Sequence, residues 1–312
     1  MSDLDFPTPA REAQTDPRQA ELIDLVARFT PGDGLHSTPI APLQLIRASA
    51  PAYRLPAVYD PGLCVVVQGR KQALMGSQVF TYDPLHCLVI SVTVPTVGQI
   101  LEATPDRPYL CVRLNIDARE VGALMLEAPA AGEPPPPTVA QPGLQVWRVT
   151  APLLDAVLRL LRLLLTPQDA PVLAPLAVRE IYYRVLTGGL GQRLRDLAVA
   201  DSHSQRIARA IDLLKRRYAE PVRVEEVAQA VHMSPSTLHH HFKQVTAMSP
   251  LQFQKHLRLH QARRLMLTEG LDAAAAGHQV GYESPSQFSR EYRRLFGAPP
   301  RAEIQAVRQA GA

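Results

Sequence analysis

The sequence has few cysteines and no long apolar run. Its three cysteines cannot form a closed set of disulfides, and none stands in a C-x-x-C pair; this excludes a disulfide scaffold and a four-cysteine zinc site. No apolar stretch approaches the ~20 residues that a membrane-spanning helix needs. The acidic N-terminus lacks the basic-then-apolar order of a signal peptide. We therefore expect a protein of the reducing cytoplasm, without a membrane segment, a metal or a cofactor.

The charge is unevenly distributed along the chain. The 312 residues are enough for about two domains. Residues 203–312 carry 16 Lys+Arg against 9 Asp+Glu, whereas residues 1–202 carry 17 against 20. Eight of the ten histidines also lie in the C-terminal third. A basic module joined to a mildly acidic one predicts a polyanion-binding part and a separate second part.

The N-terminal two thirds show mainly β patterns. Residues 1–20 are expected to be a flexible tail, followed by a short helix over Glu21–Phe29 and, later, a helix over Asp117–Glu127. Seven short β-rich runs, separated by turn residues, predict a sandwich or a small barrel. These runs are Leu43–Ala48, Leu63–Gln68, Lys71–Met75, Gln78–Tyr82, Cys87–Val92, Thr96–Glu102 and Tyr109–Asn115, and Gln145–Val149 is a candidate for one more strand.

Three helices are expected next, over Pro152–Leu165, Val172–Leu186 and Gln192–Ala200. The first of them is apolar nearly all round, which indicates a buried helix. Two alternatives stay open for its partner, namely the core of its own domain or a second copy of the chain in a homodimer.

Two short helices joined by a tight turn are predicted in the C-terminal third. Glu225–Val231 forms the first helix, and Ser234-Pro235 opens the second, because serine suits the N-cap and proline the first helical position. Apolar residues share one face of the second helix, which leaves Ser236, Thr237, His239, His240 and Lys243 facing outward. This is the form of a helix-turn-helix unit, which we call the first reader.

The same plan recurs about fifty residues later, in a unit that we call the second reader. Leu271–Val280 is its first helix, and Ser284-Pro285 opens the next, which ends at Gly297. Ser286, Gln287, Ser289, Arg290 and Arg293 face outward. The alternative, a helical bundle with basic solvated faces, does not explain the repeated Ser-Pro-Ser punctuation.

The segment between the readers is predicted to be one helix from Ser249-Pro250 to about Thr268. Nineteen residues make about 28 Å of helix, and successive major-groove faces of B-DNA lie about 34–36 Å apart. The outward side chains suit base edges, since arginine donates to guanine and glutamine bonds adenine. The sequence therefore predicts that one chain reads two adjacent major-groove segments.

These residues resemble the AraC/XylS family of bacterial transcription regulators. The stretch VEEVAQAVHMSPSTLHHHFKQVTAMSPLQFQKHLRLHQARRLM resembles its first reader and linker helix, and GYESPSQFSREYRRLFGAPP its second reader. LCVVVQGRKQALMG and TPDRPYLCVRLNID resemble an N-terminal domain of one branch of the family. The resemblance implies an α+β protein with a cupin-like signal-sensing or dimerisation β-barrel over residues 21–200 and an all-α DNA-binding domain over residues 203–301.

The resemblance also implies a function. We expect a sequence-specific regulator, with activation as the leading expectation, that binds double-stranded promoter DNA and RNA polymerase. Its N-terminal domain is expected to sense a small molecule or to mediate dimerisation, the latter together with helix 152–165. His232 and Ala247 stand where the family usually has glycine in a turn. Both turns are expected to need a positive φ.

Other chemistry has weaker support. His86 and Arg113 are candidate ligand contacts in the barrel, although a salt bridge at the rim is an equal alternative for Arg113. His256 and His260 have a chelating spacing, but no third ligand is evident. Cysteines in apolar strands are usually small core residues, and a sensor role for Cys64, Cys87 or Cys111 is the alternative. The alternative class is an enzyme with an accessory AraC-type module, similar to alkylation-repair proteins, whose zinc-bound cysteine site needs four cysteines.

Overall fold

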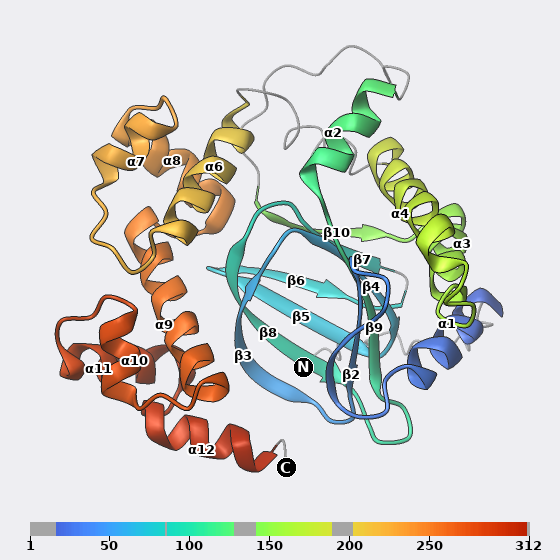
Figure 1. Cartoon of the computed structure of the whole chain (residues 1–312), viewed down its shortest axis with the longest axis horizontal. Coiled ribbons are helices and arrows are strands. Elements are labelled where there is room, and N and C mark those ends of the chain that lie inside the picture. The colour runs from blue at the N-terminus through green and yellow to red at the C-terminus, as the bar shows by residue number, and fades with distance from the viewer. Residues whose placement is uncertain (1–16, 85, 128–141, 189–201, 311–312) are drawn as a thin grey trace, which may run out of the picture.

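The N-terminal part of the computed structural model consists of two facing antiparallel sheets, which we call the β domain (Figure 1). The model describes residues 17–84, 86–127, 142–188 and 202–310. The six-stranded sheet runs β1 (Gly34–Ser37), β2 (Leu43–Ala48), β9 (Tyr109–Asn115), β4 (Gly62–Gln68), β7 (His86–Ile90), β10 (Leu144–Arg148). The four-stranded sheet runs β3 (Ala52–Tyr59), β8 (Val94–Glu102), β5 (Arg70–Met75), β6 (Gln78–Tyr82).

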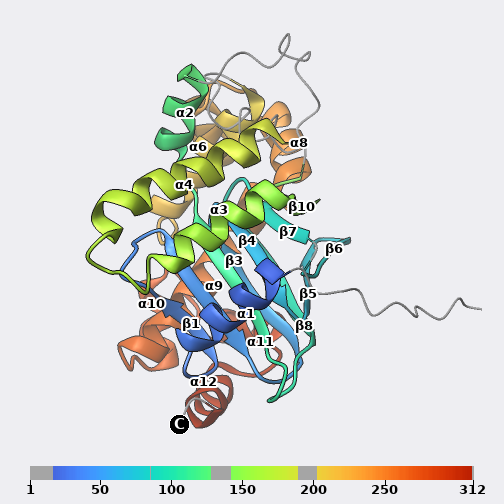
Figure 2. The same cartoon turned by 90° about the vertical axis from the view of Figure 1, so that its right-hand side faces the viewer.

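Both faces of the larger sheet are covered. In β4, Leu63, Val65 and Val67 pack with the helices, whereas Cys64 and Val66 pack into the space between the sheets. This explains why β4 reads as a continuous apolar run rather than an alternating one. Helices α1 (Pro17–Arg28), α3 (Ala151–Arg162) and α4 (Ala170–Thr187) lie across the outer face, as Figure 2 shows.

Helix α3 belongs to the core of its own domain. Leu153, Val157, Leu160 and Leu161 are buried in one cluster with α1, α4 and the sheet. Of the two alternatives that the sequence leaves open for the apolar helix 152–165, the structure therefore supports the core of the same domain.

The structure differs from the sequence-based expectations at several points. Helix α1 begins at Pro17, so residues 17–20 of the expected tail are helical, which agrees with the preference of proline for the first helical position. Strands β1 and β3 were not expected. Strand β3 contains Pro56 and lies at the edge of its sheet, where a missing backbone N–H is tolerated. The expected helix over 192–200 falls outside the described residues.

The C-terminal part is entirely helical within residues 202–310, and it lies beside the β domain (Figure 1). It comprises α6 (His203–Arg216), α7 (Val224–Ala230), α8 (Pro235–Thr246), α9 (Pro250–Thr268), α10 (Ala273–Gln279), α11 (Pro285–Phe296) and α12 (Pro300–Ala310). Helix α12 continues past the expected domain end at residue 301, and its Arg308 donates to the Met266 carbonyl oxygen. None of the helices in the described ranges combines the length and apolar character that crossing a membrane takes.

Candidate nucleic-acid interface

The two readers are built in the same way. Ser234 caps α8 by accepting a hydrogen bond from the Thr237 backbone N–H (3.2 Å), and Ser284 caps α11 by accepting from Gln287 (3.3 Å). On the inner faces Leu238 and Phe242 of α8, and Phe288 and Tyr292 of α11, are buried. This leaves the opposite face of each helix to the solvent, as the sequence predicts. The Gln287 amide does not complete a capping box, because its side chain lies toward Glu291 instead.

The turns of the first reader adopt the backbone conformation expected of them. His232 has φ 53° and Ala247 has φ 60°, and the corresponding Gly281 and Gly297 of the second reader have φ 88° and 85°. A side chain at positive φ costs about 1–2 kcal/mol. The first reader therefore bears a strain that the second reader avoids through its glycines.

The outer face of α8 presents His239, His240 and Lys243 to the solvent. Ser236 is also exposed, and Thr237 is half-buried. Both hydroxyl groups lie within hydrogen-bond distance of the Ser234 side chain, at 3.0 and 2.8 Å. The two histidines and the lysine are thus the side chains with the greatest freedom to reach a partner, while Ser236 and Thr237 lie at the helix N-terminus.

The outer face of α11 is the more cationic of the two. Ser286, Gln287, Arg290 and Arg293 are exposed, and Ser289 is half-buried. Within the described part of the chain, neither Arg290 nor Arg293 forms an ion pair or a side-chain hydrogen bond. Their guanidinium groups are therefore available for bidentate contacts to guanine or phosphate.

Linker helix α9 fixes the position of the two readers through Arg258. This side chain donates to the carbonyl oxygens of Tyr218 (2.6 Å) and Glu220 (2.9 Å), which follow α6. It also donates to Gly281 O (2.9 Å), in the turn of the second reader. Since these oxygens come from segments far apart in sequence, one guanidinium group joins both halves of the C-terminal helical part. We call this set of hydrogen bonds the Arg258 clamp.

A second connection joins α9 to α11. The Lys255 ammonium lies 2.9 Å from a Glu291 carboxylate oxygen, and the Tyr282 hydroxyl donates to the other oxygen at 2.8 Å. Partial burial alone would raise the pKa of Glu291, but these hydrogen bonds hold it below its usual value. The ion pair therefore persists at neutral pH and orients α11 on the linker.

The β domain contacts the first reader and the helix before it. Lys215 of α6 lies 2.7 Å from an Asp60 carboxylate oxygen and 3.2 Å from the Thr93 hydroxyl. The Gly143 N–H donates to the Val245 carbonyl oxygen at 2.8 Å. The β domain is thus in direct contact with α6 and α8 of the C-terminal helical part.

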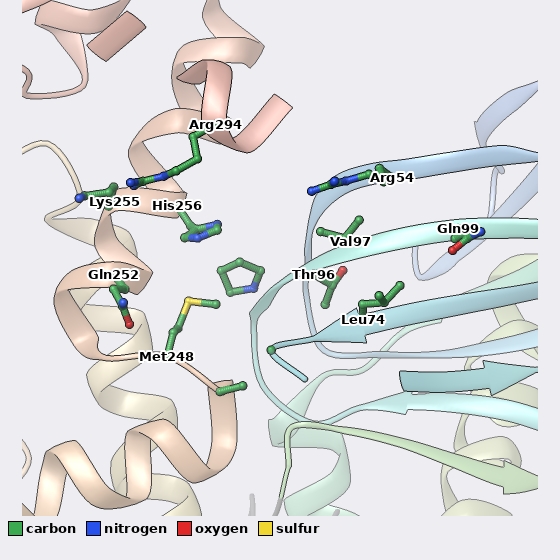
Figure 3. Close-up of a pocket in the computed structure, with 13 residues that line it drawn as sticks. Arg54, Leu74, Thr96, Val97, Gln99, Met248, Gln252, Lys255, His256 and Arg294 are labelled. Carbon is green, nitrogen blue, oxygen red and sulfur yellow. The ribbon is translucent and has the colours of Figure 1, made fainter. Parts of the chain in front are cut away.

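A cleft of about 880 Å³ lies between the β domain and the start of linker helix α9, with Arg294 of the second reader at its wall. Arg54 comes from the β-domain side, and Lys255, His256 and Arg294 come from α9 and α11 (Figure 3). Apolar side chains complete the wall, among them Leu74, Pro95, Val97 and Met248. Burial, together with the charges of Arg294 and Lys255, lowers the pKa of His256. The cleft is therefore cationic and partly apolar.

The two ligand candidates expected in the barrel lie elsewhere. The His86 ring nitrogen Nδ1 is 2.8 Å from an Asp83 carboxylate oxygen. Arg113 donates to the Asn115 side chain (3.2 Å) and to the Asp60 carbonyl oxygen (3.3 Å). Neither is among the residues that line the cleft of Figure 3. Their role as ligand contacts stays a prediction.

Sequence reasoning missed Arg258 and the cleft. Arg258 acts on backbone oxygens, which leave no side-chain pattern to recognise. The cleft combines residues 54, 255, 256 and 294, which only the packing of the two domains brings together. The one available signal was the positive charge of the C-terminal third, and it does not distinguish a cleft from a DNA surface.

Family models match most of the chain. The model of the AraC-type transcriptional regulator N-terminus matches residues 39–193, and a helix-turn-helix domain model matches residues 227–305. Together they span about three quarters of the sequence. Each therefore falls on one of the two parts described above.

The curated proteins that this chain is similar to include two transcriptional regulators. The HTH-type transcriptional regulator ArgR of Pseudomonas aeruginosa is 31% identical over 172 residues, which are 54% of this chain and 52% of that protein. The HTH-type transcriptional activator RhaS of Escherichia fergusonii is 31% identical over 165 residues, 53% of this chain and 58% of that protein. The match thus spans little more than half the length of each relative.

The fold as a whole is similar to that of ToxT from Vibrio cholerae. The apo structure of a lysine-to-alanine variant of ToxT superimposes with a TM-score of 0.56 at 11% identity, covering 86% of this chain and 98% of that one. A structure of unsaturated fatty acid bound wild-type ToxT gives a TM-score of 0.56 at 12% identity, covering 84% and 94%. At such identities the likeness concerns the fold alone. With both family models matched in order and both readers in place, the chain belongs to the AraC/XylS family of transcriptional regulators.

Proposed function

We propose that this protein is a sequence-specific DNA-binding transcription regulator that acts as an activator. It would work in the bacterial cytoplasm, at the nucleoid. The observation that carries the proposal is the pair of Ser-Pro-capped helices, α8 and α11, whose polar faces are exposed while the Arg258 clamp holds them on one linker. Activation would require contact with RNA polymerase, which in vitro transcription from the bound promoter tests.

The exposed side chains divide into two kinds of DNA contact. Arg290 and Gln287 have the planar donors that distinguish guanine and adenine in the major groove. His239 and His240 play the corresponding part in the first reader. Ser236, Thr237 and Ser286 lie in the first turns of α8 and α11, where hydroxyl and backbone N–H groups suit phosphate oxygens. The Ser289 hydroxyl, further along α11, is a fourth candidate contact to phosphate. Lys243 and Arg293 add attraction to phosphate.

Replacing Arg290 with alanine is expected to cost about 1–3 kcal/mol of binding free energy at particular base pairs, because the bidentate contact to a base is lost. The measurement is a titration of the full chain with fragments of the DNA upstream of its own gene and with base-substituted versions. Arg301→Ala is the matched control, since Arg301 is an exposed arginine on α12.

The two possible failures of this titration are different. An equal loss on every sequence would make Arg290 a phosphate contact and overturn its role in reading bases. Binding with the same affinity to every upstream fragment and to scrambled DNA would overturn the proposed function itself. The Arg301 variant is expected to lose little affinity, and equally on all fragments.

We propose further that the cleft of Figure 3 receives an anionic effector with an apolar part. Within the described ranges, neither Arg54 nor Arg294 has an ion-pair partner. An anion between them would join the β domain to the second reader. Such a ligand would therefore bias how the DNA-binding helices are held.

Decanoate is a suitable probe of the cleft, with decanol as its uncharged counterpart. Decanoate is expected to raise the Tm of the full chain, by the equivalent of about 2.7 kcal/mol at a hundredfold excess over its Kd. Arg54→Ala and Arg294→Ala should lose this shift, whereas Arg301→Ala should keep it. The same shift with decanol, or in the Arg54 variant, would contradict an anion site here.

Homodimerisation through the N-terminal domain also belongs to the proposal, but through a different helix from the one expected. Helix α3 is buried, whereas Val172 and Leu176 of α4 are 71% and 61% exposed and Leu173 is 44% exposed. We therefore place the contact on α4. Sedimentation equilibrium should give a dimer that Leu176→Glu turns into a monomer; an unchanged dimer would move the contact elsewhere.

A further inference from the structure

A polar cluster lies between the two sheets of the β domain, away from the cleft and from the readers. Two cysteines and a tyrosine come from the six-stranded sheet, and a lysine and two tyrosines come from the facing sheet. They are Cys64 of β4, Cys111 and Tyr109 of β9, Tyr59 of β3, Lys71 of β5 and Tyr82 of β6. The proposed DNA and effector functions use none of them.

The two cysteines are close neighbours on one face of the sheet. In the register of β4 and β9, Cys64 lies opposite Arg113 and Val66 lies opposite Cys111, so the cysteines form a diagonal pair. The Cys111 thiol donates to the Val112 carbonyl oxygen at 3.6 Å, and its sulfur lies close enough to that of Cys64 for a weak hydrogen bond between the two thiols. Cys64 is 6% exposed and Cys111 is fully buried. A disulfide needs closer Cα atoms than the ~7–8 Å of an ordinary diagonal pair, so bond formation would draw β4 and β9 together.

A half-buried cation, Lys71, faces this pair. The Lys71 ammonium lies 5.5 Å from the centre of the Tyr59 ring and 5.7 Å from that of Tyr109, two residues before Cys111 in the same strand. Gly98 leaves room for this arrangement, because a Cβ there would meet the Tyr59 hydroxyl at 3.0 Å and the Lys71 chain at 3.4 Å. No described carboxylate forms an ion pair with Lys71. Its charge is therefore directed at the hydroxyls and the sulfurs.

The local environments give the three thiols different pKa values. The hydrogen bond from Cys111, together with the charges of Arg113 and Lys71, outweighs burial and lowers the pKa of Cys64 to about 7. The same hydrogen bond and burial raise the pKa of Cys111. Cys87 lies on the opposite face of the sheet, under the helices, where burial raises its pKa to about 12. Cys64 has the character of an attacking thiolate, and Cys111 lies where a resolving thiol is needed.

We propose that Cys64 and Cys111 form a dithiol that hydrogen peroxide oxidises to a disulfide. The Cys64 thiolate attacks one peroxide oxygen and the O–O bond breaks, which gives a sulfenic acid and a hydroxide that leaves as water with the proton released by Cys64. The Cys111 sulfur then attacks the sulfenic sulfur, the S–S bond forms, and the S–O bond breaks. The second water leaves with the Cys111 proton. Two thiols lose two electrons in all, and one peroxide becomes two waters.

The position of the pair connects it to the rest of the molecule. Arg113, opposite Cys64, donates to the Asp60 carbonyl oxygen, and the Asp60 carboxylate contacts Lys215 of α6. Movement of β4 against β9 thus reaches the contact between the β domain and the DNA-binding part. An effect of oxidation on DNA affinity would rest on the proposed function, but the formation of the disulfide does not.

The experiment treats the reduced full chain with a slight excess of hydrogen peroxide, alkylates it in denaturant and maps the cysteines by peptide mass spectrometry. We expect a disulfide between Cys64 and Cys111, with Cys87 still alkylated. The rate should rise with pH, reach half of its maximum near pH 7 and level off above that, as the thiolate fraction of Cys64 does. In Cys111→Ser, dimedone should trap a sulfenic acid at Cys64; Cys87→Ser should form the disulfide as the unmodified chain does.

Several results would overturn the proposal. Two of them concern the unmodified chain, so a folding defect cannot explain them. One is oxidation of Cys87 at the same rate as Cys64, and the other is no oxidation of any cysteine until the protein is unfolded. In Cys64→Ser, with a circular dichroism spectrum matching that of the unmodified chain, continued oxidation of Cys111 at the original rate would have the same effect. If the disulfide forms as expected but the chain binds all DNA sequences equally well, the result counts against the proposed function and not against the dithiol.

Discussion

Replacing Gly281 with alanine is expected to lower the free energy of unfolding by about 2–5 kcal/mol, the sum of a backbone strain and a collision. Gly281 has φ +88°, a conformation that L side chains rarely adopt. A Cβ there would lie 2.1 Å from the Ala219 carbonyl oxygen and 3.1 Å from Cζ of Arg258. Relief of this collision requires moving the loop after α6 or the guanidinium group, so the Arg258 clamp would open.

The control for this variant is Gly297→Ala in the same reader. Gly297 has φ +85°, but a Cβ there would meet nothing within 4 Å. Only the backbone cost of about 1–2 kcal/mol is then expected. Chemical denaturation of both variants, followed by circular dichroism, measures the difference. Equal losses would mean that the loop after α6 does not pack against Gly281 as described, and the clamp would lose its support.

The sequence predicts the readers well because their boundaries depend on local chemistry. Ser249 caps α9 with a full capping box involving Gln252, and the helix spans Pro250–Thr268 as expected. Serine and proline fix a helix start through their own backbone, and glycine fixes an end, without help from distant residues. The exposed positions of α8 and α11 then follow from the helical period.

The sequence predicts less where distant segments decide the outcome. No strand is predicted over Ala52–Tyr59, which contains Pro56, and its position at a sheet edge, where Pro56 pairs with Val97, is what accommodates the proline. Helix 152–165 has the same apolar pattern whether it packs on its own sheet or on a second chain. The Arg258 clamp depends on backbone oxygens brought near by folding. In each case the deciding contact lies far away along the chain.

The largest expected effect on DNA binding comes from changing the distance between the two subsites. Helix α9 has 19 residues, or about 28 Å, and the Arg258 clamp and the Lys255–Glu291 ion pair tie its first half to the loop after α6 and to the second reader. The readers are therefore suited to subsites about one DNA turn apart on one face. Five inserted base pairs rotate the second subsite by about half a turn, and ten add about 34 Å.

The measurement uses a promoter fragment whose two subsites have been mapped by base substitution, with five or ten base pairs inserted between them. Each insertion is expected to weaken binding by about 100-fold or more, because the contacts of one reader are lost. Scrambling the sequence of the second subsite should weaken binding by the same factor. The same insertion outside the subsites should change nothing. Unchanged affinity for the fragment with ten added base pairs would show that the readers bind independently, which contradicts a rigid linker between them.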